Sequence, residues 1–385
     1  MRRIAVLIAL VATTTLLAAG VALTQTPEED TDPYIVVLEE SVDSPSQVAE
    51  GIEGRQENLE VDDVYTEALE GFSAEIPDDS LDEVRNNSSV AYVERDKKVT
   101  TTAQTLPWGI NRIDADLSST RAGDGTGEVS GVHVYVIDTG IAYGSNAHPD
   151  LNVVNHINMT GRGPNRDCDG HGTHVAGTLA ARDNTSFVVG VASRAPLTGV
   201  KVLDCNGEGW DSDVIDGIEW VTEHAQKPAV ANMSLGGSKS RALNTAVRNS
   251  AASGVFYSLS AGNKRMNACK ASPAMTGAGT NNGIVTTAAT TRANREVRWS
   301  NFGRCVDLWA PGIDILSTRM GGGTTTMSGT SMAAPHVGGT AALFRSDRPG
   351  AGPASVEANL KEDAKLLDHR SKDGRRIRLV KAREY

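Results

Sequence analysis

From Trp108 onward, short apolar runs alternate with longer runs that have a helical pattern. The apolar runs that predict strands are Val132–Ile137, Val189–Ala192, Leu197–Leu203, Val230–Leu235, Val255–Ser260 and Ile284–Ala288. The clearest helical runs between them are His174–Ala181, Asp211–His224 and Ser240–Gly254. This alternation predicts an α/β fold, a parallel sheet with helices on both faces whose strand carboxyl ends form the ligand crevice.

The segment before Trp108 has a different pattern, which predicts a small α+β unit. Tyr34–Leu38 and Val90–Val93 predict strands, Val64–Ile76 predicts strands around Gly71, and polar stretches between them predict two helices, the second within Pro77–Asn86. The threonine-rich stretch Thr100–Thr105 follows, and it is typical of a linker that a protease can cut.

Charge also divides the chain. Residues 27–103 contain 22 acidic and 5 basic side chains, whereas residues 104–385 contain 26 acidic and 30 basic ones. The net charge of −11 therefore combines an acidic N-terminal unit with a slightly basic C-terminal unit. No basic cluster is interleaved with aromatic residues, so we expect no nucleic-acid partner.

The first residues have the pattern of a secretory signal peptide over residues 1–24. Arg2 and Arg3 precede an apolar run from Ile4 to Leu17, and small residues follow. A membrane anchor is the alternative, but Thr13–Thr15 interrupt the run and leave it short for a span. We therefore expect a secreted, extracellular protein with no membrane association after the signal is removed.

The chain has four cysteines, Cys168, Cys205, Cys269 and Cys305. An even number behind a signal peptide favours two disulfides, with three possible pairings. Pairing in sequence order would close loops of about 37 residues, each stabilising by roughly 3–4 kcal/mol. A zinc site is the competing interpretation, and the lack of any Cys-x-x-Cys spacing argues against it.

Ser331 is the candidate nucleophile. It lies in Gly329–His336, between a loop with three consecutive glycines, Gly321–Gly323, and an apolar helical run. A serine hydroxyl is a weak nucleophile, so it needs a base, a group that orients the base, and donors for the oxyanion. The same chain offers candidates for all three.

Asp138 and His171 are the candidate orienting group and base. Asp138 follows the buried strand and precedes a Thr-Gly turn, where the alternative role is a cap for the next segment. His171 lies at a helix start between glycines that keep its imidazole approachable. His171 and His174 could instead bind a metal, but no third ligand is evident.

Asn263 is the candidate oxyanion donor, because it follows the strand that ends near Ser260 and carries an amide. Alone it would be a turn asparagine. The combination decides otherwise, since Asp, His and Ser in this chain order are the order of subtilisins.

The motifs extend this to a resemblance. Matching segments are Val136–Gly140, His171–His174, Asn232–Gly236 and Gly329–Ala333. From Trp108 to about Ala382 the chain resembles the subtilisin-like serine peptidases, in particular their proteinase K-like branch. The resemblance implies a roughly seven-stranded parallel sheet in a catalytic domain, residues 104–385, with endopeptidase activity. It also implies that residues 33–102 are a ferredoxin-like propeptide.

The resemblance implies a role for each candidate. Ser331 attacks the scissile carbonyl, His171 takes and returns the proton, and Asp138 holds the imidazole. The Asn263 amide and the backbone N–H of Ser331 bind the oxyanion. The pocket is framed by Ser234, Leu235, Gly236, Ser260, Ala261 and Gly262, while Leu203–Gly209, which includes Gly207, pairs with the substrate as an added strand.

The resemblance also implies disulfides Cys168–Cys205 and Cys269–Cys305, and a structural calcium. Asp307 matches a family calcium carboxylate, with carbonyls expected from Ala274–Gly283; the alternative is a hydrogen bond near the Cys305 bridge.

The partners expected are protein and peptide substrates and the chain's own propeptide, as an intramolecular inhibitor and folding aid. The catalytic protein is expected to be a monomer. Two rival functions are an inactive peptide-binding protein, which the intact candidate residues argue against, and a hydrolase of small esters, which the strand-pairing segments argue against.

Overall fold

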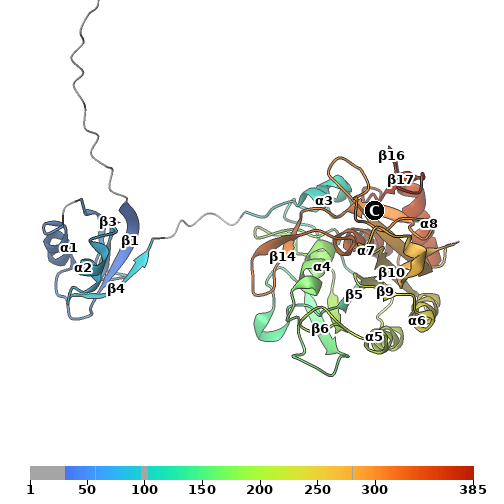
Figure 1. Ribbon diagram of the computed structural model, residues 1–385, viewed down its shortest axis with the longest axis horizontal. Helices are drawn as coiled ribbons and strands as arrows, with labels where there is room; N and C mark the ends of the chain where they lie inside the picture. Colours follow the sequence, from blue (N-terminus) through green and yellow to red (C-terminus); the bar gives the residue numbers. More distant parts are fainter. Residues whose placement is uncertain (1–30, 57, 97–102, 280) are drawn as a thin grey trace, which may run out of the picture. The chain divides into compact units, whose positions relative to one another are not determined.

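The computed structural model describes residues 31–56, 58–96, 103–279 and 281–385 (Figure 1). The chain divides into two compact units between Thr100 and Thr101, and each is described by itself. The expected signal peptide and residues 100–102 of the expected linker lie outside the described residues.

The N-terminal unit is a four-stranded antiparallel sheet with two helices. Its elements in chain order are β1 (Thr31–Leu38), α1 (Pro45–Glu53), β2 (Glu60–Tyr65), β3 (Gly71–Pro77), α2 (Leu81–Arg85) and β4 (Val90–Arg95). The strand order β2-β3-β1-β4 with antiparallel neighbours is the ferredoxin-like arrangement, as expected. Val36 and Leu38 of β1 and Phe72, Ala74 and Ile76 of β3 recur every second residue and form its core.

The C-terminal unit is built on one nine-stranded sheet in the order β16-β17-β13-β12-β10-β8-β5-β7-β6. Its strands are β5 (His133–Asp138), β6 (Val153–Asn158), β7 (Leu197–Lys201), β8 (Ala229–Met233), β10 (Val255–Ser260), β12 (Ile284–Thr290), β13 (Leu308–Pro311), β16 (Lys365–Arg370) and β17 (Arg376–Leu379). Neighbours are parallel except for β16 and β17, which are antiparallel. Two small ribbons stand apart, β9 (Gly237–Ser238) with β11 (Ala271–Ser272) and β14 (Ile315–Thr318) with β15 (Thr324–Met327).

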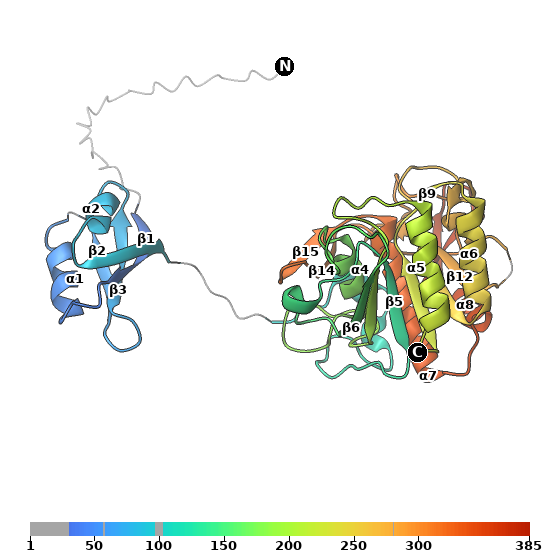
Figure 2. The same ribbon diagram turned by 90° about the horizontal axis from the view of Figure 1, so that it is seen from below.

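Helices cover both faces of this sheet. The helices are α3 (Trp108–Arg112), α4 (His171–Ala180), α5 (Asp211–His224), α6 (Arg241–Ala252), α7 (Thr330–Asp347) and α8 (Pro353–Asp363). In β5, Val134 and Val136 belong to the core shared with α4 and α7, whereas Tyr135 and Ile137 belong to the core shared with α5 and α6. Because both faces are buried, the strand reads as a continuous apolar run. Figure 2 shows α5 and α6 side by side.

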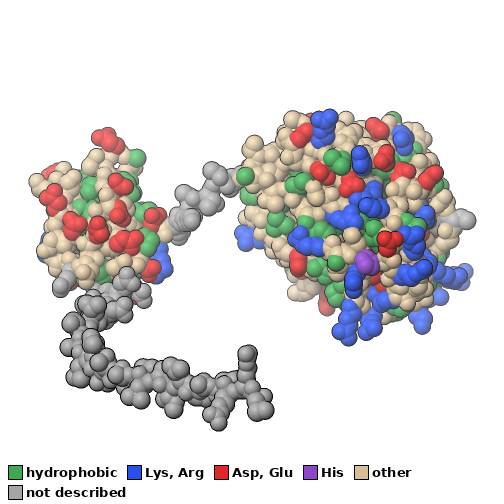
Figure 3. Space-filling model, turned by 90° about the horizontal axis from the view of Figure 1, so that it is seen from above, with side chains coloured by type: hydrophobic (Ala, Val, Ile, Leu, Met, Phe, Trp, Pro, Cys, Tyr) green, Lys and Arg blue, Asp and Glu red, His purple; other side chains and the backbone are tan. Residues whose placement is uncertain are grey.

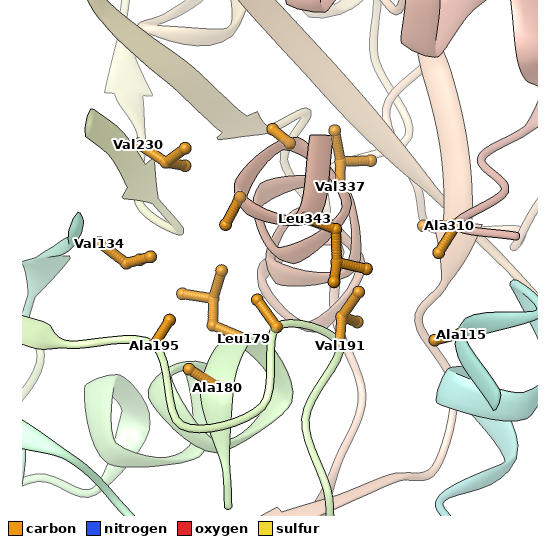
Figure 4. Packing of buried hydrophobic residues seen from close by; sticks show 14 of the residues in the cluster. Ala115, Val134, Leu179, Ala180, Val191, Ala195, Val230, Ala310, Val337 and Leu343 are labelled. Carbon is orange, nitrogen blue, oxygen red and sulfur yellow. The ribbon is translucent and has the colours of Figure 1, made fainter. Parts of the chain in front are cut away.

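Helix α7 lies at the centre of the larger core. Figure 4 shows Val337 and Leu343 of α7 among Val134, Leu179, Val191 and Val230, which come from β5, α4, a loop and β8. All residues from Thr330 to Arg345 except Ser331 are buried. The apolar sequence after the candidate nucleophile therefore anchors the helix that carries it.

The prediction of a strand at Val189–Ala192 is wrong. This segment is not part of the sheet, because its backbone N–H groups donate to carbonyls at the end of α4 instead. The bonds run from Gly190 N–H to Ala181 O, from Val191 N–H to Thr178 O and from Ala192 N–H to Leu179 O. These bonds satisfy carbonyls that a helix end leaves without partners. The segment is apolar because it is buried, and a buried strand would have the same apolar sequence, so the sequence alone does not distinguish the two.

The sheet has two more strands than the resemblance implies. The additional hairpin of β16 and β17 is rich in charged residues, and its buried apolar side chains are Leu367, Ile377 and Leu379. Its position at the sheet edge leaves the polar face to solvent, so apolar periodicity does not reveal it.

Surface charge follows the division of the sequence. In Figure 3, Asp and Glu gather on the N-terminal unit, while Lys and Arg are abundant on the visible face of the C-terminal unit. Within the described part of the chain, no helix is both long enough and apolar enough to cross a bilayer.

Candidate active site

The candidate residues meet at the carboxyl edge of the parallel sheet. Asp138 is the last residue of β5, Ser234 follows β8, and Asn263 follows β10 by three residues. Parallel strands place such residues at one edge, where open α/β sheets bind ligands. A groove of about 1030 Å³ runs along this edge, and both His171 and Ser331 line it.

Asp138 and His171 form a hydrogen-bonded pair. Asp138 is fully buried, and its Oδ1 lies 2.7 Å from His171 Nδ1. Because Nδ1–H donates to the carboxylate, the other ring nitrogen, Nε2, is left for the groove. The His171 side chain is 26% exposed, which makes this nitrogen accessible.

The surroundings of His171 favour its charged form. Burial lowers the pKa of the imidazole, but the negative charge of Asp138 and its hydrogen bond, together with Asp169 and Asp167, outweigh burial and raise the pKa to about 9. A base of this pKa holds a proton firmly once it has taken one. It is also protonated in much of the free protein at neutral pH.

Asp167 and Lys201 hold the segments around this pair. The buried Asp167 accepts hydrogen bonds from the N–H groups of Asp169, Gly170 and Thr173, which orders the start of α4. Lys201 is fully buried at the end of β7 and donates to Thr139 O at 2.8 Å and to Leu203 O at 2.6 Å. The lysine therefore links the residue after Asp138 to the loop that borders the groove.

Ser331 is the second residue of α7, and a proline sets its environment. Pro335 lies four residues later and has no N–H, so the Ser331 carbonyl lacks its helical donor. The Ser234 hydroxyl supplies one, at 2.7 Å. In return, the Ser331 hydroxyl donates to Ser234 O at 2.9 Å. Since a hydroxyl has one proton, Ser331 does not donate to His171 in this structure.

Asn263 is oriented by Thr330. The N–H and the hydroxyl of Thr330 both donate to Asn263 Oδ1, at 3.0 and 2.8 Å, and the Thr330 hydroxyl accepts from Gly262 N–H at 2.9 Å. With Oδ1 engaged, the Nδ2 donors lie on the opposite side of the carboxamide. The groove lining includes Asn263.

The structure brings the expected substrate residues to the same groove. Its lining includes Leu203, Gly207, Ser234, Leu235, Gly236, Ser260, Ala261 and Gly262. Residues 203–209 form a turn closed by the bond from Asp204 N–H to Glu208 O at 2.7 Å. Sequence reasoning did not identify Thr330, Asp167, Lys201 or the Ser234 hydroxyl, although Thr330 and Ser234 lie inside the motifs.

His174 is not available as a metal ligand. It is fully buried, and its Nε2 lies 2.9 Å from Ile315 O, to which it donates. Burial lowers the pKa of His174 to about 4, so the ring is neutral. Its role is to join α4 to β14.

Two disulfides are present, Cys168–Cys205 and Cys269–Cys305, the pairs that the resemblance implies. Cys168 lies three residues before His171, and Cys205 lies in the turn that borders the groove. The first bridge therefore ties a groove loop to the start of α4.

The surroundings of Asp307 do not fit calcium. Lys361 Nζ lies 2.9 Å from Asp307 Oδ1, while Oδ2 accepts from Thr286 N–H at 2.9 Å. Two carbonyls of the expected calcium loop are also engaged, those of Ala274 and Thr276. In the described part of the chain, no group of three or more His, Cys, Asp or Glu could hold a metal ion. The donors around Asp307 therefore do not fit the calcium that the resemblance implies there, and a structural calcium stays a prediction.

Comparison with known proteins supports the interpretation of both units. The "Subtilase family" pattern matches residues 129–377, which is more than half of the chain. The chain belongs to the subtilase family. Residues 33–102 match the "Peptidase inhibitor I9" pattern, so the expected family and the expected propeptide type are both confirmed.

Named proteins similar to this subtilase are serine proteinases. It is 43% identical over 329 residues to an extracellular serine proteinase of Thermus sp. (strain Rt41A), covering 80% of this chain and 73% of that protein. It is 37% identical to alkaline serine exoprotease A of Vibrio alginolyticus, covering 85% of this chain and 63% of the relative. The crystal structure of a cold adapted subtilisin-like serine proteinase is similar, with a TM-score of 0.63, 40% identity, and coverage of 71% of this chain and 97% of that one.

Proposed function

We propose that this subtilase is a secreted serine endopeptidase that hydrolyses proteins through an acyl-enzyme on Ser331. One observation carries the proposal: the His171–Asp138 hydrogen bond orients an imidazole in the groove that Ser331 and Asn263 also line. These are the base, the orienting group, the nucleophile and an oxyanion donor that acyl transfer needs.

Acylation begins when the Ser331 hydroxyl turns from Ser234 O to His171 Nε2. Catalytic hydrogen bonds often form fully only when substrate is bound. Nε2 takes the hydroxyl proton as Oγ bonds to the scissile carbonyl carbon, and Asp138 stabilises the imidazolium that results. The carbonyl oxygen becomes an anion, which receives hydrogen bonds from Asn263 Nδ2 and from the backbone N–H of Ser331. This N–H lies in the first turn of α7 and has no helical acceptor.

The intermediate collapses when the C–N bond breaks and His171 gives its proton to the leaving amine. Water then attacks the ester, with His171 again taking the proton. A second collapse returns the proton to Ser331 Oγ and releases the acid.

The groove suits an extended peptide. Residues of the 203–209 turn and Ser234–Gly236 both line it, and pairing of a strand-like substrate with the backbone of such segments is a recurring mode of peptide recognition. Backbone pairing is independent of side chains, so we expect activity on many sequences. A compact small ester would leave most of this surface unused.

The N-terminal unit is proposed to be an inhibitory propeptide that assists folding and is removed by self-cleavage near residues 99–105. Its acidic composition opposes the basic balance of residues 104–385, which favours association between them. Secretion through the signal sequence over residues 1–24 and a monomeric mature enzyme complete the proposal.

The test compares the full-length chain with its Ser331→Ala variant by intact mass and casein hydrolysis. We expect the parent to lose the residues before the cleavage point near 99–105 and to digest casein, and the variant to retain residues 33–102 and remain inactive. Ser328→Ala, in the preceding loop, is the matched control and should process normally. Hydrolysis of a short ester without hydrolysis of casein would contradict the peptidase proposal.

A second test concerns the propeptide. A chain that lacks residues 27–103 should fail to reach its active fold, and supplying those residues as a separate polypeptide should restore activity. Full activity of the shortened chain alone would exclude the folding role.

A further inference from the structure

A buried cluster of three charges lies where α8 meets β12 and the segment before β13. Glu357 and Lys361 are one turn apart on α8, and Asp307 directly precedes β13. The Lys361 ammonium contacts Glu357 Oε1 and lies 2.9 Å from Asp307 Oδ1. The exposed fractions of the Glu357, Asp307 and Lys361 side chains are 0%, 6% and 16%, so the cluster is largely shielded from water.

The second oxygen of each carboxylate is bound by backbone. Glu357 Oε2 accepts from the N–H groups of Asn282 at 2.6 Å and Gly283 at 2.7 Å, and more weakly from Ile284 at 3.3 Å. Asp307 Oδ2 accepts from Thr286 N–H, as described above. The ammonium thus completes a network that joins α8 to the start of β12 and to the segment before β13.

Buried carboxylates are unfavourable unless a cation or several donors compensate them. Here Lys361 provides the cation in the place where the family resemblance leads one to expect calcium. A calcium ion binds carboxylate oxygens at about 2.3–2.6 Å, so one on Asp307 Oδ1 would lie within about 5.5 Å of the ammonium. The two positive charges would repel each other strongly in this shielded position.

The close surroundings of the Asp307 carboxylate also argue against a calcium ion there. A Cβ atom built on Gly277 would lie 2.4 Å from Asp307 Oδ2, which shows how closely the backbone approaches this carboxylate. Calcium needs six to eight oxygen ligands, whereas the groups on this carboxylate are donors, an ammonium on Oδ1 and a backbone N–H on Oδ2. The side of Asp307 that is not covered by backbone is covered by Lys361.

We propose that Lys361 is a built-in substitute for calcium at Asp307. Its ammonium neutralises the buried carboxylates and holds α8 against β12 without any external ion. A tethered cation cannot be removed by a chelator or lost by dilution, so this part of the fold is independent of calcium concentration.

The test measures thermal unfolding of the full-length chain carrying Ser331→Ala, which prevents self-digestion. All five tryptophans lie between Trp108 and Trp309, so tryptophan fluorescence reports on the C-terminal unit alone. Melting temperatures are recorded with excess calcium and with excess chelator. The variants are Lys361→Met, Asp307→Asn and their combination, and Lys365→Met, at an exposed lysine on β16, is the control.

We expect Lys361→Met to lower the melting temperature by roughly 5–10 °C in chelator, and Lys365→Met to leave it nearly unchanged. Asp307→Asn should cost less in the Lys361→Met background than alone, because the two groups interact. Calcium should change the melting temperature of the parent and of Asp307→Asn by the same amount. Recovery of Lys361→Met by calcium would also support the proposal, since the ion would then occupy the vacated position.

The opposite pattern of melting temperatures would overturn the proposal that Lys361 replaces calcium. If calcium stabilises the parent, Asp307→Asn abolishes this effect and Lys361→Met is neutral, then calcium is the cation at Asp307. If Lys361→Met does not fold, the calcium response of the parent and of Asp307→Asn decides alone. None of these readouts depends on peptidase activity, so the proposed function can fail without affecting the result.

Discussion

Ser234 and Ser331 each donate a side-chain hydrogen bond to the other's backbone carbonyl, at 2.7 and 2.9 Å. The exchange exists because Pro335 withholds the helical donor from Ser331 O. It joins the end of β8 to the start of α7 and holds the nucleophile in a resting position. Ser331 must break one of the two bonds before it can meet His171.

Replacing Ser234 by alanine should lower kcat/KM about tenfold, because the Ser331 carbonyl loses its donor and α7 loses a constraint at its first turn. Steady-state kinetics on a peptide amide measures this. The double variant Ser234→Ala/Pro335→Ala restores an N–H opposite Ser331 O and should recover part of the loss. If the double variant is no better than the single one, the missing donor is not the cause.

Replacing Asn263 by alanine should lower kcat by about a hundred- to a thousandfold with little change in KM, because the oxyanion donor acts only in the transition state. Asn263→Asp should be similarly impaired, since a carboxylate cannot donate. Thr330→Ser is the control, because it retains the hydroxyl that bonds to Asn263. A purely higher KM in the alanine variant would assign Asn263 to substrate binding instead.

The activity should increase toward alkaline pH. His171 acts as a base only when neutral, and its pKa of about 9 means that kcat/KM falls about tenfold per unit below that pH. Asp169→Asn removes one negative charge that raises this pKa but keeps a side-chain oxygen that accepts from the backbone N–H of His171. The acid limb of the kcat/KM profile should therefore move to lower pH. An unmoved limb in this variant would show that Asp169 does not act on His171.

The same shift has a consequence for stability. Because the folded pKa lies above the unfolded value of about 6.5, the His171 ion pair stabilises the fold fully below that value, and the contribution disappears as pH rises toward 9. Denaturant unfolding of Ser331→Ala across this range measures it. His171→Gln should remove this part of the pH dependence.

Loss of either disulfide should lower the free energy of unfolding by about 3–4 kcal/mol, since the bridges span 37 and 36 residues. The two double variants should differ in activity. Cys168→Ser/Cys205→Ser frees the turn at residues 203–209 and should raise KM, whereas Cys269→Ser/Cys305→Ser should affect stability more than KM. Equal effects on KM would contradict the role of the first bridge in ordering the groove.

Much of the fold follows from local pattern. Buried strands such as β5 are apolar on both faces, and the candidate residues at their ends are polar in an apolar context, so both are visible in the sequence. Val189–Ala192 misled the prediction because burial against a helix end and burial in a sheet select the same residues. The hairpin of β16 and β17 was missed for the opposite reason, since its charged face conceals its few buried positions.

Contacts between distant residues could not be predicted in the same way. The proposed substitution of Lys361 for a metal depends on the contact between this lysine of α8 and Asp307. The two residues are distant in the sequence, so no local pattern predicts the contact. Lys201 likewise appears as an ordinary strand-end lysine until the structure shows the two carbonyls that it holds. The role of the Ser234 hydroxyl becomes visible only when Pro335 is placed opposite it.

Helix α7 has no solvent-facing stripe between Thr330 and Arg345, and Ser331 is its single accessible point. Apart from Thr330, which orients Asn263, and Pro335, the other positions there are packed in the core, so most exchanges disturb the core before they alter catalysis. Variation that retunes which peptides are accepted must therefore arise in the loops around the groove. A laboratory library for new specificity should leave this helix and Cys205 untouched and diversify residues 206–209 and 236–239.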